Sequence, residues 1–95
     1  MNYHVCPGVV LTEVCGEYLL VATKEARGKV PYAKGMNDSG AYFWNLFSKR
    51  LNFAQIVEQT VLDHNLTKEE AEPMVRQFMD ALAGMGYLIW EEDVP

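Results

Sequence analysis

Short runs of β-branched and aliphatic residues fill the first third of the chain. Two of them, residues 9–14 (VVLTEV) and 18–23 (YLLVAT), flank the turn Cys15-Gly16-Glu17, a pattern that predicts a β-hairpin. A third run at residues 30–34 (VPYAK) alternates weakly and predicts a further strand. Because Pro31 has no N–H to donate, this strand must lie at an edge of the sheet or direct the proline nitrogen outward.

The chain then changes to the spacing of amphipathic helices. Asn37 or Asp38 is the expected N-cap of a first helix. Its apolar face at helical period consists of Tyr42, Phe43, Leu46 and Phe47. Asn52 is the expected N-cap of a second helix that ends near residues 64–65. The apolar positions of this second helix are Phe53, Ile56, Val57 and Val61.

A third helix begins at a capping box, with Thr67 at the N-cap and Glu70 three residues later. Its apolar positions are Ala71, Met74, Val75, Phe78, Leu82 and Met85. Pro73 lies beyond the first residues of this helix and predicts a kink or a loosened first turn. The short apolar run at residues 87–90 predicts an extended segment packed on the core, before an acidic tail. Strands therefore precede helices, and the order predicts an α+β fold.

Length and composition are those of one globular domain. The chain has 95 residues, of which 49% are apolar and 22% charged. No apolar run approaches the roughly 20 residues that a membrane-spanning helix needs. Residues 1–7 lack the basic start and apolar stretch of a signal peptide, so we expect a cytoplasmic protein.

Charge is distributed unevenly along the sequence. The formal net charge is −5, which argues against a protein that binds nucleic acid by neutralising phosphates. Residues 24–34, however, carry the four basic side chains Lys24, Arg27, Lys29 and Lys34 against Glu25 alone. An anionic partner is expected to meet the protein at this segment.

No arrangement of residues in the sequence indicates catalysis. The two cysteines, Cys6 and Cys15, are nine residues apart, and neither C-x-x-C nor closely spaced histidines supply the ligands of a zinc site. We expect both thiols to be free. The chain also lacks a phosphate-binding glycine loop and a G-x-S-x-G turn. The sequence thus predicts a protein that is not an enzyme and holds neither metal nor cofactor.

The second half of the chain resembles the PqqD-like family, also called RiPP recognition elements. The resemblance rests on an ordered set of residues and not on one motif: Asn37, Ser39-Gly40-Ala41, Trp44, Asn52 and the ending Leu82-Ala83-Gly84-Met85-Gly86-Tyr87-Leu88. The hairpin that precedes them also fits the family. Together these features extend over about residues 7–90, and we expect residues 1–95 to form a single domain of this kind.

The resemblance implies a winged-helix-like domain of three N-terminal strands, three helices and a short C-terminal extended segment. It also implies a peptide chaperone that binds the leader segment of a ribosomally synthesised precursor peptide and presents it to a modifying enzyme, such as a radical-SAM maturase. The leader would add as a strand beside the third strand, in a groove walled by the third helix. On this chain the implied strand residues are Val30, Pro31, Tyr32, Ala33 and Lys34. The implied helix residues are Met74, Gln77, Phe78 and Ala81, of which Met74 and Phe78 could equally belong to the core.

The basic segment adds a hypothesis about the leader itself, because it lies on or next to the expected peptide-binding edge. We expect acidic residues of the leader to meet Lys29 or Lys34. Two alternatives remain open. One is a winged-helix regulator, for which the acidic third helix has the wrong sign to meet DNA. The other is a module that docks on a protein without any precursor peptide. We expect no nucleic-acid or membrane partner, and either a monomer or a weak or domain-swapped dimer formed through the open strand edge.

Overall fold

The computed structural model describes residues 3–90, and within them strands come first and helices follow. The strands are β1 (Tyr3–Val5), β2 (Val9–Val14), β3 (Glu17–Ala22), β4 (Ala33–Met36) and β5 (Leu88–Trp90). The helices are α1 (Asp38–Ser48), α2 (Phe53–His64) and α3 (Lys68–Gly84). This order confirms the predicted α+β class, the hairpin and the three helices. The predicted acidic tail lies outside the described residues.

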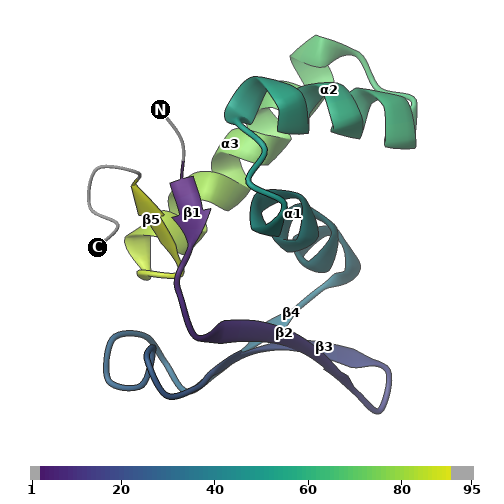
Figure 1. The fold of residues 1–95 in the computed structure, drawn as a ribbon. Helices are drawn as coiled ribbons and strands as arrows, with labels where there is room; N and C mark the ends of the chain where they lie inside the picture. Colours follow the sequence, from purple (N-terminus) through teal and green to yellow (C-terminus); the bar gives the residue numbers. More distant parts are fainter. Residues whose placement is uncertain (1–2, 91–95) are drawn as a thin grey trace.

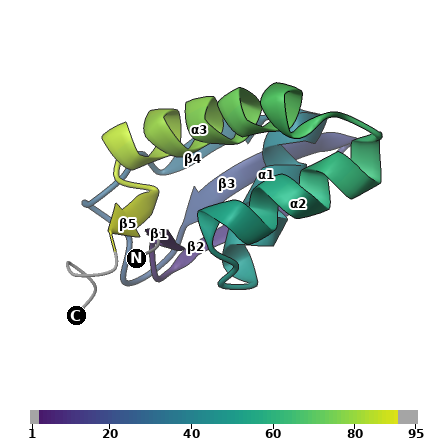
Figure 2. The same cartoon turned by 90° about the horizontal axis from the view of Figure 1, so that it is seen from above.

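Two small antiparallel sheets organise the strands. The larger has the order β2-β3-β4, and helices α1 and α3 lie over one of its faces (Figures 1 and 2). The smaller pairs β1 with β5, so that His4 lies opposite Ile89 and the two ends of the described chain meet. The sequence did not predict β1, because three residues with one central histidine show no strand pattern. The extended segment expected at residues 87–90 is confirmed as β5.

The third strand begins later than predicted. The expected strand at residues 30–34 is corrected to Ala33–Met36, and the register places Lys34 opposite Leu20 and Met36 opposite Tyr18. Pro31 therefore precedes the strand and removes no donor from it. Weak alternation in VPYAK misled the prediction, because Val30 is buried through its contact with the end of α3 and not as part of a strand.

Each helix begins at the residue that the sequence indicates. The Asn37 side chain accepts from the Gly40 N–H at 2.7 Å, and Asn52 forms a capping box with Gln55. Thr67 and Glu70 form the predicted capping box of α3. The sequence predicted a kink or a loosened first turn at Pro73. Both hydrogen bonds of the capping box are present, so the first turn is not loosened, and α3 continues through Pro73 to Gly84. The kink stays a prediction.

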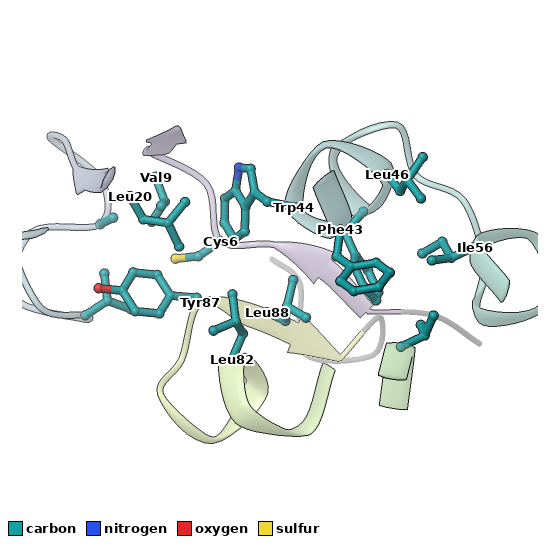
Figure 3. Packing of buried hydrophobic residues seen from close by; sticks show 14 of the residues in the cluster. Cys6, Val9, Leu20, Phe43, Trp44, Leu46, Ile56, Leu82, Tyr87 and Leu88 are labelled. Carbon is teal, nitrogen blue, oxygen red and sulfur yellow. The ribbon is translucent and has the colours of Figure 1, made fainter. Parts of the chain in front are cut away.

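The core lies between the larger sheet and the helices. Figure 3 shows side chains from many elements meeting there, among them Leu20 from β3, Trp44 from α1 and Leu82 from α3. The helical spacing correctly predicted the buried positions Ala71, Val75 and Leu82. Met74 and Met85, two further apolar positions of this helix, are 41% and 40% exposed. None of the helices within residues 3–90 is long and apolar enough to span a membrane.

The segment after α3 is bound to the segment that leads into β4. The fully buried Tyr87 donates its hydroxyl to the Pro31 carbonyl at 3.1 Å. Gly86 has a positive φ of 88°, and a Cβ at this residue would lie 3.2 Å from Val30 Cγ1. A close approach that only glycine permits thus brings the two segments together, and one hydrogen bond joins them.

A second link joins α1 to α2. Tyr42 donates its hydroxyl to Asp63 Oδ2 at 2.6 Å, and Gln59 donates to Oδ1 of the same carboxylate at 2.8 Å. Burial and the bond to Asp63 raise the pKa of Tyr42 to about 12. The Tyr42 and Gln59 hydrogen bonds lower the pKa of Asp63 below its ordinary value of 3.8.

Replacing Tyr87 by phenylalanine tests the first link. The variant keeps the buried ring and loses the hydroxyl, so we expect the free energy of unfolding to fall by about 1 kcal/mol, the usual worth of such a bond. Tyr32→Phe is the matched control, because Tyr32 is 66% exposed, and it should leave the stability nearly unchanged. Urea denaturation measures both, and equal stability of Y87F and Y32F would contradict the role given to this bond.

Acid titration tests the second link. Since the folded pKa of Asp63 lies below its unfolded value, the link stabilises the protein above about pH 4, and this contribution is lost as the pH falls through the folded pKa. In Tyr42→Phe the carboxyl pKa should rise toward its ordinary value. The stability difference between wild type and variant should therefore shrink on acidification. Carboxyl carbon NMR shifts and urea denaturation between pH 2 and 7 measure both effects, and an unchanged Asp63 pKa in the variant would contradict the assignment.

Candidate functional site

One edge of β4 is open, and the residues that point to it can be identified. Ala22 donates its N–H to the Tyr32 carbonyl at 2.8 Å, in line with the β3–β4 register. Alternate residues of an antiparallel strand bond to the same neighbour, so Lys34 and Met36 direct their N–H and C=O groups to β3. Ala33 and Gly35 direct theirs to the other side, where no further strand within residues 3–90 pairs with β4.

The open edge is accessible to an extended chain. Ala33 and Gly35 are both exposed, and a Cβ placed at Gly35 would meet no atom within 4 Å. Neither is a proline, so each offers a donor as well as an acceptor. This edge can therefore accept another strand through two N–H and two C=O groups.

A groove lies beside this strand, between α3 and the start of α1. Its lining includes all four helix positions implied by the family resemblance, Met74, Gln77, Phe78 and Ala81. The other lining residues come from the N-cap and first turns of α1: Asn37, Ser39, Gly40 and Phe43. The groove is open and has a volume of about 320 Å³. Figure 2 shows α3 running along the side of the sheet on which β4 forms the edge.

Phe78 forms the floor of the groove and also belongs to the core. Its ring centroid lies 5.4 Å from that of Phe43 and 5.9 Å from that of Phe47, and the residue is partly buried. Met74, Gln77 and Ala81 are exposed. The sequence left open whether Met74 belongs to core or groove, and the structure places it on the groove side.

Gly40 lies in the first turn of α1, against the side chain of the last residue of β4. A Cβ at Gly40 would lie 2.9 Å from Met36 Cε and 3.1 Å from the capping oxygen of Asn37. The glycine thus lets the last residue of β4 pack on the first turn of α1, directly beside the groove. The sequence analysis did not assign Asn37, Ser39, Gly40 and Phe43 to the site, although the Asn37 cap after the strand indicates that the chain turns there.

The other expected site residues lie within β4 or in the segment that precedes it. Lys34 is opposite the buried Leu20, which puts its half-buried side chain on the sheet face that the helices cover. Lys29 is exposed in the preceding loop. Burial raises the pKa of the Cys6 thiol, and the positive charge of Lys29 partly offsets this rise. The side chain of Val30 is buried, and the Pro31 carbonyl is bonded to Tyr87. Tyr32 is largely exposed.

Reactive side chains do not gather at this groove. Among residues 3–90 no group of three or more His, Cys, Asp or Glu side chains is placed to hold a metal ion. Both cysteines are free, as predicted, with Cys6 buried and Cys15 exposed in the hairpin turn. The groups gathered at the site are backbone amides, apolar side chains, lysines and the polar side chains of Asn37, Ser39 and Gln77, which suit binding.

The fold and the site define a small α+β protein with an open strand edge beside an apolar groove. Its structure is similar to a solved structure of TbiB1 in complex with the TbiA(beta) leader peptide, with a TM-score of 0.70 and 20% identity. The likeness covers 90% of this chain and 93% of the matched chain, and it confirms the fold that the PqqD-like resemblance implies. No protein-family model matches the sequence, and no curated protein matches it either.

Proposed function

We propose that this protein is a non-catalytic peptide chaperone that binds the leader segment of a ribosomally synthesised precursor peptide. The leader would add as a strand to the open edge of β4 and place side chains in the groove beside α3. The observation that carries the proposal is the coincidence of Ala33 and Gly35 at a free edge with an apolar groove. The similarity in fold to a protein solved with a leader peptide supports it.

Main-chain and side-chain contacts would have different roles in this complex. Hydrogen bonds to Ala33 and Gly35 provide affinity for any extended peptide. Alternate side chains of the added strand point to the same face, so one apolar side chain placed over Phe78 would fix the register. Met74 suits such a contact because its unbranched side chain adapts to the shape of its partner.

Lysines at the beginning of the strand would select the charge of the leader. Lys34 lies within β4 and Lys29 in the loop before it. We propose that acidic leader residues meet them, while Val30, Pro31 and Tyr32 form the end of the site at which the added strand begins or leaves. A separate modifying enzyme, such as a radical-SAM maturase, would act on the precursor while its leader is held here.

Ala33→Pro tests strand addition. The substitution removes an N–H that points to the open edge, and it leaves the β3–β4 hydrogen bonds in place. We expect leader affinity to fall by about threefold to tenfold, the equivalent of one hydrogen bond of about 0.5–1.5 kcal/mol. Fluorescence anisotropy with synthetic leader peptides from neighbouring short reading frames measures the loss.

Glu13→Pro is the matched control for this variant. Thr23 donates to the Gly8 carbonyl, and the alternation that follows directs the Glu13 N–H to the free edge of β2, on the other side of the same sheet. This proline should leave leader affinity unchanged. Equal affinities of wild type and A33P would contradict strand addition at β4, whereas no binding of any leader by the wild type would favour a protein-docking module.

Charge reversal tests the lysines. In the double variant Lys29→Glu/Lys34→Glu, leader binding should weaken and its dependence on salt should become flatter, because attraction between the lysines and leader carboxylates is lost. Lys49→Glu/Lys68→Glu carries the same charge change away from β4 and should behave like the wild type. Leader titrations between 50 and 500 mM NaCl distinguish the two double variants. If the wild type and both variants show the same dependence on salt, the leader does not meet Lys29 or Lys34.

A further inference from the structure

The three-stranded sheet has an outer face, which no helix of residues 3–90 covers (Figure 1). Alternation along the strands places Glu17, Leu19 and Val21 of β3 on this face, together with Ala33 and Gly35 of β4. Of the strand residues on the outer face only Glu17 is charged, and it is exposed. A strand added to β4 would direct every second side chain over this face and the others into the groove beside α3. The outer face therefore takes part in leader binding as well.

Gly35 is a glycine that the folded chain itself does not require. Its φ is not positive, and a Cβ at this residue would meet no atom within 4 Å. The register between β3 and β4 also runs through Gly35 without a bulge. A glycine inside a strand weakens it, and one that serves no bulge or bend marks a place where a ligand approaches closely. The space beside Gly35 is thus available to a ligand.

An open hollow surrounds Gly35 at the end of β4. Its volume is about 490 Å³, and its lining includes Leu19, the cross-strand partner of Gly35. The charged residues of the lining are Glu17 and Asp38, both exposed, and no lysine or arginine lines it. Within residues 3–90 no ion pair or side-chain hydrogen bond engages either carboxylate. A ligand group in this hollow therefore meets an apolar side chain, bare backbone and negative charge.

We propose that an arginine of the leader occupies this hollow, an inference that rests on the proposed function. Its aliphatic stem would lie across Gly35 and against Leu19, and its guanidinium would meet the carboxylate of Glu17. Neighbouring strands lie about 4.8 Å apart, so the added strand is about 10 Å from β3. A long side chain spans that distance where β4 has no side chain in its path. The planar guanidinium also matches a carboxylate better than the ammonium group of lysine does.

The charges beside the two ends of β4 thus have opposite signs. Lys29 and Lys34 lie at its beginning, and Glu17 and Asp38 lie beside its end. A leader that meets both pairs carries acidic residues near one end of the added strand and the arginine near the other. Because outward and inward side chains alternate, the arginine lies an odd number of positions from the apolar residue over Phe78. This pattern would fix the register of the leader.

A scan of leader peptides against two charge variants tests the guanidinium contact. Synthetic leader peptides from neighbouring short reading frames carry alanine, arginine, glutamate or tryptophan at each position in turn, and fluorescence anisotropy measures their affinities. With the wild-type protein, one position should prefer arginine over alanine by about threefold to fivefold, as an exposed ion pair allows. In Glu17→Lys this position should prefer glutamate instead. Glu13→Lys makes the same charge change on β2 and should keep the preference for arginine.

A further variant tests the space at Gly35. Gly35→Val keeps the backbone N–H and C=O of the open edge and suits a strand, but its side chain stands where the arginine stem would lie. This variant should therefore bind the arginine and alanine peptides with equal affinity. Thr12→Val changes a side chain of β2 on the same outer face, away from the open edge, and should retain the preference for arginine. Urea denaturation should show Gly35→Val to be at least as stable as the wild type, which separates the loss from misfolding.

Three results would overturn the arginine site while strand addition at β4 stands. They are no position that prefers arginine, the same preference in Glu17→Lys as in the wild type, and an undiminished preference in Gly35→Val, each alongside a loss of affinity in Ala33→Pro. A preference for tryptophan that disappears in Gly35→Val would also overturn it, because the space would then belong to an aromatic ring. If no leader binds the wild type, or Ala33→Pro binds as well as the wild type, the proposed function fails and the arginine site fails with it.

Discussion

A strand has two hydrogen-bonding edges, and within residues 3–90 β4 is paired along only one of them. Its pairing with β3 holds Lys34 and Met36 in place, which leaves Ala33 and Gly35 to present their backbone groups on the other side. An edge of this kind is a liability in a small protein unless it is blocked or used. The rest of the molecule holds this strand at both ends and places a mostly apolar groove beside it.

A glycine takes part in the contacts at each end of β4. At the beginning, Gly86 allows close contact with Val30, and Tyr87 binds the Pro31 carbonyl. At the end, Gly40 allows Met36 to pack on the first turn of α1. The family resemblance rests partly on these same glycines. At Gly40 a Cβ would meet the end of the Met36 side chain and the capping oxygen of Asn37, and at Gly86 the positive φ favours glycine.

The sequence predicted the elements better than it predicted their limits. Caps such as Asn52 and Thr67 were found correctly because the signal is local and chemical: a side-chain oxygen that accepts from the backbone N–H groups of the next turn. The beginning of β4 was missed because the segment before it is held by a long-range contact, the bond from Tyr87 to Pro31, which are 56 residues apart in the sequence. A contact of that kind leaves no periodic pattern near either residue.

The groove, too, was predicted only in part from the sequence. The spacing of Met74 and Phe78 indicated an apolar helix face, yet could not show that Phe78 packs on the core while Met74 is exposed beside it. The contribution of α1 was also missed, because Gly40 and Phe43 join the site only through the turn between β4 and α1. The sequence therefore indicated the kind of surface through the family resemblance, and tertiary packing determined its walls.

The three faces of α3 explain how one helix of 17 residues borders two separate grooves. Buried residues such as Val75 bind the helix to the core, and the face with Met74 borders the strand edge. The face with Glu72 borders the second groove, which lies between α2 and α3. Because the buried positions fix the rotation of the helix, a leader in the groove beside β4 meets a preformed wall and need not order it. Each groove has its own few lining residues on α3, so substitutions at the lining of one leave the lining of the other unchanged.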